Sequence, residues 1–238
     1  MPIDVGPYRF SLNDARKTLS NLDELLDFAP HAAQSALEPL RGDLRRLVDD
    51  TDTGDDDAVA AAVAELFPAL LDARTIIVDA EATPPPATGH VAQINVSDGG
   101  VPKLPVDAVE IDFAGVTTDR QATRQHHGRP WQALCMWSSE VIAGLAADGH
   151  PIGPGSAGEN VTIAGVDWSA MRSGVRLAIG TATVQVSAAA VPCKQNAGWF
   201  SDGNFDRIHH RHGPVSRIYA TVIEPGTVAS GDPVVLEP

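Results

Sequence analysis

Cys193 is the residue in this sequence whose type and surroundings best suit chemistry. It lies in AVPCKQNAGWF (residues 190–200), where an alternating apolar run stops, between Pro192 and Lys194. A cation beside a cysteine stabilises the thiolate, which is the form that binds metals, and thiolate sulfur is a ligand that soft metals prefer. The pattern therefore indicates a metal-binding thiol at the end of a strand. The alternative is an inert thiol in the core, because cysteine also behaves as a small hydrophobic residue.

The second cysteine, Cys135, has different surroundings. It lies in the apolar run QALCMW (residues 132–137), so we predict a buried structural thiol there. The two cysteines do not form a C-x-x-C pair, and two are too few for a disulfide framework. This usage of cysteine indicates a reducing compartment.

Two further motifs resemble known binding signatures but lack their context. HHRH brings together His209, His210 and His212, yet a structural zinc site usually has ligand pairs at short spacing in two places, and only one cluster is present. GPGSAG (residues 153–158) has the G-x-G-x-x-G spacing of a dinucleotide-binding turn, but strand-like residues follow it instead of a helix. We expect a partly solvated loop at the histidines and a tight loop at the glycines.

Composition and charge limit the classes of protein to which the chain can belong. Of its 238 residues, 43% are hydrophobic and 20% are charged, which is typical of a globular protein. The net charge is -14, and residues 1–83 hold 17 acidic residues against 7 basic ones. Nucleic acid and anionic membranes repel such a chain, so neither is expected as a partner. The sequence shows no signal-peptide pattern and no apolar stretch of about 18 residues, so we expect a cytoplasmic protein.

The first third of the chain has the periodicity of helices. Residues 11–82 carry apolar residues at spacings of three and four, which predicts amphipathic helices. Pro68 is expected to bend or interrupt the third of them. Three consecutive prolines at 84–86 cannot continue a helix. We therefore predict an acidic helical domain over residues 1–83 and a linker over residues 84–88.

From residue 89 to 238 the apolar residues alternate with polar ones, as they do in strands. The strand-like runs are VEIDF, VRLAI, TATVQVSA, RIYATVI and PVVLEP, and glycine and proline turns join them. One helix is predicted within SSEVIAGLAADG (residues 138–149), with Gly149 at its C-terminal end. Many short strands with few helices favour a mostly antiparallel β-barrel that is closed or nearly closed. The predicted fold class is therefore α+β, with a helical bundle followed by this barrel.

Five segments, in order, carry a resemblance to a known family. They are VAQINVSDGGVPKLPV, GVTTDRQATRQHHGRPWQALCMW, EVIAGLAADGHPIGPGSAGENVTIAGVDWSAMRSG, VPCKQNAGWFSDGNF and VIEPGTVASGDPVVL. Over residues 89–238 the chain resembles the MOSC domain, named for the C-terminal part of molybdenum cofactor sulfurase. The resemblance is greatest to the stand-alone bacterial branch associated with resistance to 6-N-hydroxylaminopurine. It says nothing about residues 1–83.

The resemblance implies a β-barrel that binds the molybdenum cofactor, with a cysteine as a metal or sulfur ligand at the position of Cys193. It also implies a set of basic and amide donors that face the cofactor and cradle its phosphate. These donors are Lys103, Arg120, His127, Lys194 and Asn196. His126 is an alternative to His127, because adjacent residues on a strand point to opposite faces. Solvated surface charge is the alternative for Lys103 and Lys194.

The reaction implied by the resemblance is reductive cleavage of an N–O bond in N-hydroxylated bases or related compounds, with electrons from a redox protein. Family members often read HGGP where this chain reads HGRP, so Arg129 is expected at the entrance of the site, where it would affect the substrate more than the cofactor. The alternative is a non-catalytic carrier, in which Cys193 holds cofactor or persulfide for delivery.

A third hypothesis rests on the amphipathic helices alone and makes the protein an interaction or assembly module. Three short helices form a marginal core, so we expect them to bury their remaining apolar face on their own barrel or on a second copy. A homo-oligomer is therefore left open by the sequence.

Overall fold

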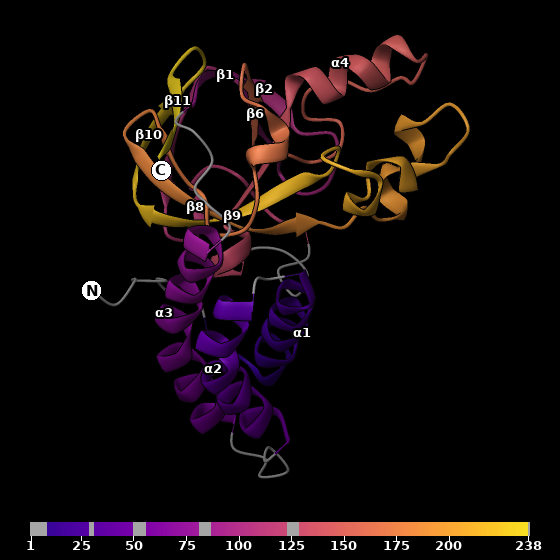
Figure 1. The fold of residues 1–238 in the computed structure, drawn as a ribbon. Helices are drawn as coiled ribbons and strands as arrows, with labels where there is room; N and C mark the ends of the chain where they lie inside the picture. The colour runs from indigo at the N-terminus through magenta and orange to yellow at the C-terminus, as the bar shows by residue number, and fades with distance from the viewer. Residues whose placement is uncertain (1–8, 29–30, 50–55, 81–86, 123–128, 238) are drawn as a thin grey trace. The chain divides into compact units, whose positions relative to one another are not determined.

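The computed structural model describes residues 9–28, 31–49, 56–80, 87–122 and 129–237 (Figure 1). The chain divides into two compact units, residues 1–83 and residues 84–238. The first unit is helical and the second is built mainly of strands. The predicted α+β class, a helical region followed by a mostly antiparallel barrel, is confirmed.

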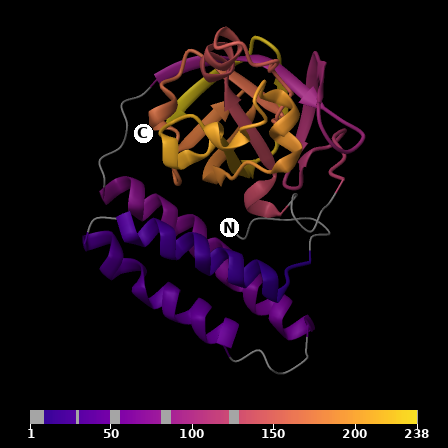
Figure 2. The ribbon, with the colours of Figure 1, turned by 90° about the vertical axis from the view of Figure 1, so that its right-hand side faces the viewer.

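Three helices make up the described part of the N-terminal unit: α1 (Leu12–Phe28), α2 (His31–Asp49) and α3 (Asp56–Ala80). Each contacts the other two, and Figure 2 shows them side by side. Apolar side chains at helical spacing are buried in this unit, among them Ala15, Leu22, Leu37, Leu40, Leu44 and Val63. The predicted interruption at Pro68 does not occur, because α3 continues through it. Packing of an apolar face stabilises a helix more than propensity does, and it can offset the hydrogen bond that a proline removes.

Seven strands, counted over the described residues, form the barrel of the C-terminal unit. They are β1 (Ala87–Val96), β5 (Leu134–Ser138), β6 (Val161–Ala164), β7 (Arg176–Ile179), β8 (Ala182–Ala190), β9 (Arg217–Glu224) and β11 (Pro233–Glu237). They pair in the order β11-β7-β8-β9-β5-β6-β1, and β1 pairs again with β11, which closes the ring. β5 and β6 run parallel, whereas the other pairs are antiparallel. Because β1 begins at Ala87, residues 87 and 88, assigned above to the linker, belong to the barrel.

Smaller elements flank the barrel. β2 (Leu104–Val106) pairs with β1, while β3 (Ala108–Asp112), β4 (Gly115–Val116) and β10 (Gly226–Ala229) form a separate three-stranded sheet. The predicted helix is confirmed as α4 (Ser139–Ala147), between β5 and β6. The Ser138 hydroxyl caps it by accepting hydrogen bonds from two N–H groups of its first turn, and Gly149, at φ +87°, follows its C-terminal end. In the described part of the chain, every helix is too short or too polar to cross a membrane.

The interior of the barrel is filled with apolar side chains. Side chains alternate between the two faces of a strand, so one set from every strand points inward. The inward set is exposed by 1% or less and includes Ile94, Leu134, Met136, Val161, Ile163, Leu177, Ile179, Val184, Ala220, Val222, Val234 and Leu236. A barrel of this size is filled by its own side chains. A binding site on this unit must therefore lie on the outer wall or in the loops.

The closure of the barrel predicts where the chain can be cut. A fragment of residues 84–238 should fold without the helices, because it contains every strand of the ring. A fragment that starts at residue 91 lacks the pairing of residues 87–90 with residues 233–236. We expect it to be less stable by at least about 2 kcal/mol, since each hydrogen bond contributes about 0.5–1.5 kcal/mol. Urea unfolding followed by tryptophan fluorescence measures the difference, and equal stability of the two fragments would contradict the closure.

Candidate functional site

A row of polar residues crosses the outer wall of the barrel. Asn95 on β1, Asn160 just before β6, Cys135 on β5 and Tyr219 on β9 follow one another across the sheet. The Asn95 N–H donates to the Asn160 carbonyl at 2.7 Å, and the Asn160 N–H donates to the Cys135 carbonyl at 2.7 Å. Cys135 stands opposite Tyr219. These residues alternate with the apolar ones inside the barrel, so their side chains face outward.

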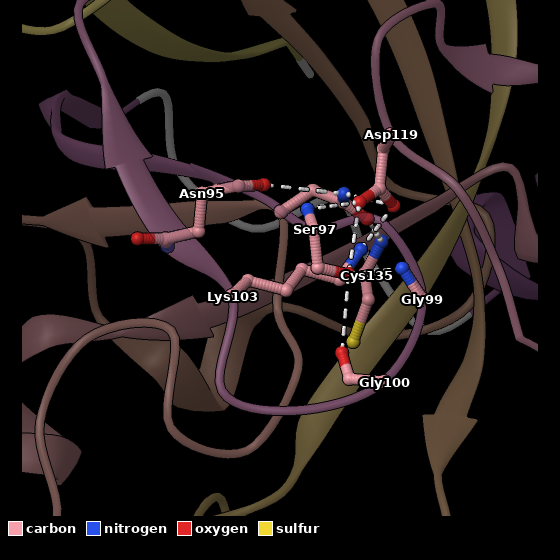
Figure 3. A network of polar contacts seen from close by, with 8 residues as sticks. Asn95, Ser97, Gly99, Gly100, Lys103, Asp119 and Cys135 are labelled. Carbon is pink, nitrogen blue, oxygen red and sulfur yellow. Dashed lines mark hydrogen bonds and ion pairs between the residues drawn. The ribbon is translucent and has the colours of Figure 1, made fainter.

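Lys103 and Asp119 form a buried ion pair at this wall (Figure 3), with side chains that are 9% and 4% exposed. Asp119 also accepts hydrogen bonds from the Ser97 N–H at 2.8 Å and from the side-chain amide of Asn160 at 3.0 Å. The Lys103 N–H donates to the Gly155 carbonyl at 2.9 Å. Lys103 is therefore neither a solvated surface charge nor an unpaired cation for a phosphate, because Asp119 neutralises it.

Arg120, the residue after Asp119, lies at the surface. Its side chain is 70% exposed and pairs at 3.2 Å with the exposed carboxylate of Asp98. The backbone N–H of Arg120 donates to the Ser97 carbonyl at 2.8 Å, which ties this segment to the end of β1. The structure thus places Arg120 beside the buried pair in sequence but in a solvated position.

Of the residues expected near the HGRP motif, Arg129 is described, whereas His127 and its alternative His126 lie outside the described residues. Arg129 is 2% exposed, and its guanidinium carbon lies 5.8 Å from the ring centroid of Trp131. A side chain buried to this extent does not line an entrance. The expectation that Arg129 stands at the entrance of the site is therefore wrong.

Cys193 is exposed and precedes a short 3₁₀ helix, η3 (Lys194–Trp199). Its N–H donates to the side-chain oxygen of Asn196 at 3.2 Å, and its carbonyl accepts from the Asn196 N–H at 2.9 Å. These two bonds hold the backbone on both sides of the thiol. Lys194 is exposed beside it. The alternative of an inert core thiol does not fit Cys193.

Asn196 is buried, and its side chain is committed to the protein. Arg217 Nη2 donates to Asn196 Oδ1 at 3.2 Å, and Arg217 Nη1 donates to the carbonyl of Ala157. The side-chain amide of Asn196 donates to the same carbonyl at 3.3 Å. The structure thus places Asn196, expected to face the cofactor, between the loop of Cys193 and the glycine-rich loop.

The glycine-rich loop, residues 153–158, connects α4 to β6. Gly155 has φ +82°, and a Cβ there would lie 2.3 Å from the carbonyl oxygen of Lys103. Gly158 has φ +92°, and a Cβ there would lie 2.9 Å from the Val101 side chain. The glycine spacing therefore serves a close approach of this loop to the segment of residues 101–103, and the prediction of a tight loop is confirmed.

Cys135 is buried, as predicted, and three charged residues act on its thiol. The pKa of the Cys135 thiol is raised to about 11, mainly by burial; the charge of Glu159 adds to the rise, whereas the charges of Arg217 and Lys103 oppose it. Cys135 therefore stays protonated near neutral pH, which is not the state that binds metals.

Glu159 is fully buried below the glycine-rich loop. Its Oε1 accepts hydrogen bonds from the Gly155 N–H at 2.5 Å and from the Thr162 hydroxyl at 3.3 Å, while burial raises the pKa of the carboxyl group.

Sequence reasoning missed Glu159, Asp119 and Arg217. Each lies in a turn or at the end of an alternating strand, where a charge normally indicates solvent, and nothing local distinguishes them.

The histidine cluster forms a surface network of its own. His210 and His212 lie in η5 (His210–His212), which follows η4 (Phe205–Ile208), and His209 directly precedes η5. His212 Nε2 lies 2.8 Å from Asp206 Oδ2, and Arg211 binds the other oxygen; these contacts lower the pKa of Asp206 to about 2. Among residues with described side chains, no group of three or more His, Cys, Asp or Glu is arranged to hold a metal ion.

Comparison with known families identifies a domain within the C-terminal unit, residues 84–238. The family model for the MOSC domain matches residues 123–235. The chain contains a MOSC domain. This family is associated with binding of the molybdenum cofactor. Comparison with curated proteins gives no match.

Solved structures share the fold. YiiM from Geobacillus stearothermophilus is 25% identical at a TM-score of 0.51, with 63% of this chain and 75% of that chain covered. YiiM from Escherichia coli is 23% identical at a TM-score of 0.50, with 63% and 70% covered. The YuaD protein from Bacillus subtilis is 19% identical at a TM-score of 0.53, with 63% and 96% covered. The match to the family model confirms the resemblance of the sequence to the MOSC domain.

The buried ion pair predicts a large loss of stability when one partner is removed. Asp119→Ala leaves the charge of Lys103 buried without a partner, which should lower the free energy of unfolding of the MOSC domain by about 3–5 kcal/mol. Arg120→Ala, which breaks an exposed pair, is the matched control and should change it by less than about 1 kcal/mol. Urea unfolding of the full chain measures both. Equal effects of the two variants would show that the pair is not buried in solution.

The two thiols of the MOSC domain should react at very different rates. With a pKa of about 11, roughly one Cys135 side chain in a thousand is ionised at pH 8, and burial hinders access as well. A disulfide reagent should therefore modify Cys193 at least about 100-fold faster than Cys135. Mass spectrometry of digested samples assigns each rate, and urea-unfolded protein provides the reference in which the rates converge. Similar rates in the native protein would contradict the burial of Cys135.

Proposed function

We propose that this protein binds the molybdenum cofactor through Cys193 and reduces N-hydroxylated bases or related compounds. The observation that carries the proposal is the exposed thiol of Cys193, shortly after β8, whose backbone N–H bonds Asn196, which in turn bonds Arg217. The other cysteine, Cys135, is buried and protonated near neutral pH, so it does not compete for the metal.

Two exposed basic residues fit the chemistry of this cofactor, together with the thiol of Cys193. Thiolate sulfur suits a soft metal, and the exposed ammonium of Lys194, the next residue, attracts anionic groups. Arg120 is a second donor in this proposal, since its pair with Asp98 is exposed and such pairs are weak enough to exchange for a phosphate. Lys103 is not proposed as a phosphate donor, because its ammonium already pairs with the carboxylate of Asp119.

The proposed reaction needs a source of electrons. Conversion of R–NH–OH to R–NH2 and water consumes two electrons and two protons, and the cofactor, when bound, supplies this electron transfer. We propose a redox protein as the donor of the electrons. The acidic N-terminal unit suits a basic surface on that partner. A cytoplasmic location belongs to the same proposal, since a reducing compartment keeps cysteines as thiols.

A second candidate function is a carrier of the cofactor or of sulfur. The exposure of Cys193 favours it, because another protein could reach the thiol for delivery. The two candidates differ in turnover. A reductase supplied with electrons converts many substrate molecules per protein, whereas a carrier releases its cargo once.

Replacement of Cys193 tests the proposal. We expect Cys193→Ser, produced in a host that makes molybdopterin, to retain at least about tenfold less molybdenum, because a hydroxyl is harder and far less acidic than a thiol. Reduction of an N-hydroxylated base with a chemical electron donor should fall below detection in the same variant. Metal analysis by mass spectrometry and quantification of the reduced base are the two measurements.

Cys135→Ser is the matched control. It should keep its molybdenum and its turnover, while the free energy of unfolding falls by about 1–3 kcal/mol, because a hydroxyl replaces a buried thiol. Full molybdenum content in Cys193→Ser would refute the ligand role. Full molybdenum content in the wild-type protein without turnover would favour the carrier.

A further inference from the structure

Arg217 stands out as a charged side chain buried at the start of β9. It is 7% exposed, and such burial of a guanidinium is costly unless the charge is compensated and hydrogen-bonded. The donors Nη1 and Nη2 are used by Ala157 and Asn196, whereas Nε is buried with no partner among the described residues. Arg217 is therefore not a solvated surface charge.

The hydrogen bonds of Arg217 join β9 to two loops that are distant in sequence. In the glycine-rich loop it binds the Ala157 carbonyl, and in η3 it binds the side-chain oxygen of Asn196. The same oxygen of Asn196 accepts the N–H of Cys193 at 3.2 Å. Asn196 therefore links Arg217 to the backbone of Cys193 through hydrogen bonds on both sides.

We infer that Arg217 is the positioning residue for Cys193. By binding Asn196 and Ala157 together it fixes the loop that presents the thiol against the glycine-rich loop, so that the sulfur is held in one place when it ligates a metal. The inference rests on the proposed function, in which Cys193 is the ligand. Arg217 itself touches neither substrate nor cofactor in this account.

The geometry requires an arginine in particular. A guanidinium presents separate N–H donors in a rigid fork, whereas a lysine ammonium is a point charge on a flexible chain. Here two nitrogens of the fork reach two different acceptors, one on each loop. A lysine at position 217 keeps the charge but holds only one loop at a time.

Three variants of the full chain test the inference, with Arg217→Lys as the principal one. Arg217→Lys retains the buried charge, and Asn196→Ala removes the same link from the side of the Cys193 loop. The exposed Arg176 on β7 provides the control Arg176→Lys. Cys193→Ser serves as the reference for a site without its sulfur ligand. Circular dichroism and thermal unfolding establish that each variant is folded.

The first readout needs no cofactor. Hydrogen exchange of the amides at residues 193–197 and 155–158 should be at least about tenfold faster in Arg217→Lys and Asn196→Ala, while the amides of β9 beyond residue 219 exchange as in the wild type. Arg176→Lys should match the wild type throughout. Unchanged exchange in both loops of folded Arg217→Lys would overturn the inference.

The second readout follows the metal. Protein from a host that makes molybdopterin should retain molybdenum with about 10- to 100-fold lower affinity in Arg217→Lys, which is typical of the loss of a residue that orients a ligand. X-ray absorption of the residual molybdenum should show the same loss of sulfur coordination as Cys193→Ser. Loosened loops with a wild-type sulfur coordination would overturn the role of Arg217 and leave the proposed function intact. A wild-type sulfur coordination in Cys193→Ser would instead refute the proposed function.

Discussion

The filled interior of the barrel is the constraint on which the rest of the structure depends. β1 pairs with both β6 and β11, so the sheet closes and its inner face is packed with apolar side chains. Close packing of this kind leaves no space for a ligand inside. The polar side chains of the same strands must face outward, yet Asn95, Asn160 and Arg217 are buried there. The loops that cover them therefore have to satisfy their hydrogen bonds.

Opposite charges and backbone groups serve as hydrogen-bond partners for several of these buried side chains. The ammonium of Lys103 meets Asp119, Arg217 meets two oxygen acceptors, and the carboxylate of Glu159 meets the Gly155 N–H. Buried pairs add little net stability, because desolvation offsets the attraction, but a missing partner is expensive. The loop of Cys193 takes part in these bonds through Asn196, whereas Glu159 Oε2 and Arg217 Nε are buried with no partner among the described residues.

Much of the fold could be predicted from sequence because periodicity reports local structure. The helical spacing in residues 11–82 and the alternation after residue 89 indicated the helices and the strands, and Gly149 indicated the end of α4. The continuation of α3 through Pro68 could not be predicted, because it depends on packing between helices. The pairing of β1 with β11 joins the two ends of the unit, and no local pattern encodes it.

The candidate site was harder to predict than the fold for the same reason. Cys193 and the glycine-rich loop could be identified from their immediate neighbours in sequence, whereas the environments of Lys103 and Asn196 depend on partners far along the chain. Lys103 meets Asp119 16 residues away, and Asn196 meets Arg217 21 residues away. A basic or amide residue in a turn is exposed more often than not, so sequence reasoning treats it as available to a ligand. The structure places both inside the network that supports the site.

The hydrogen bonds that hold the loop of Cys193 bear on the choice between a reductase and a carrier. A carrier benefits from a thiol that can move towards a second protein, and its loop needs few fixed contacts. The loop of Cys193 is instead held on both sides of the thiol by Asn196, which Arg217 joins in turn to the glycine-rich loop. Catalytic sites depend on such preorganised ligands, because a displacement of about 1 Å can cost about 100-fold in rate. An exposed thiol on a rigid base, reachable by a small substrate, therefore fits repeated turnover better than delivery.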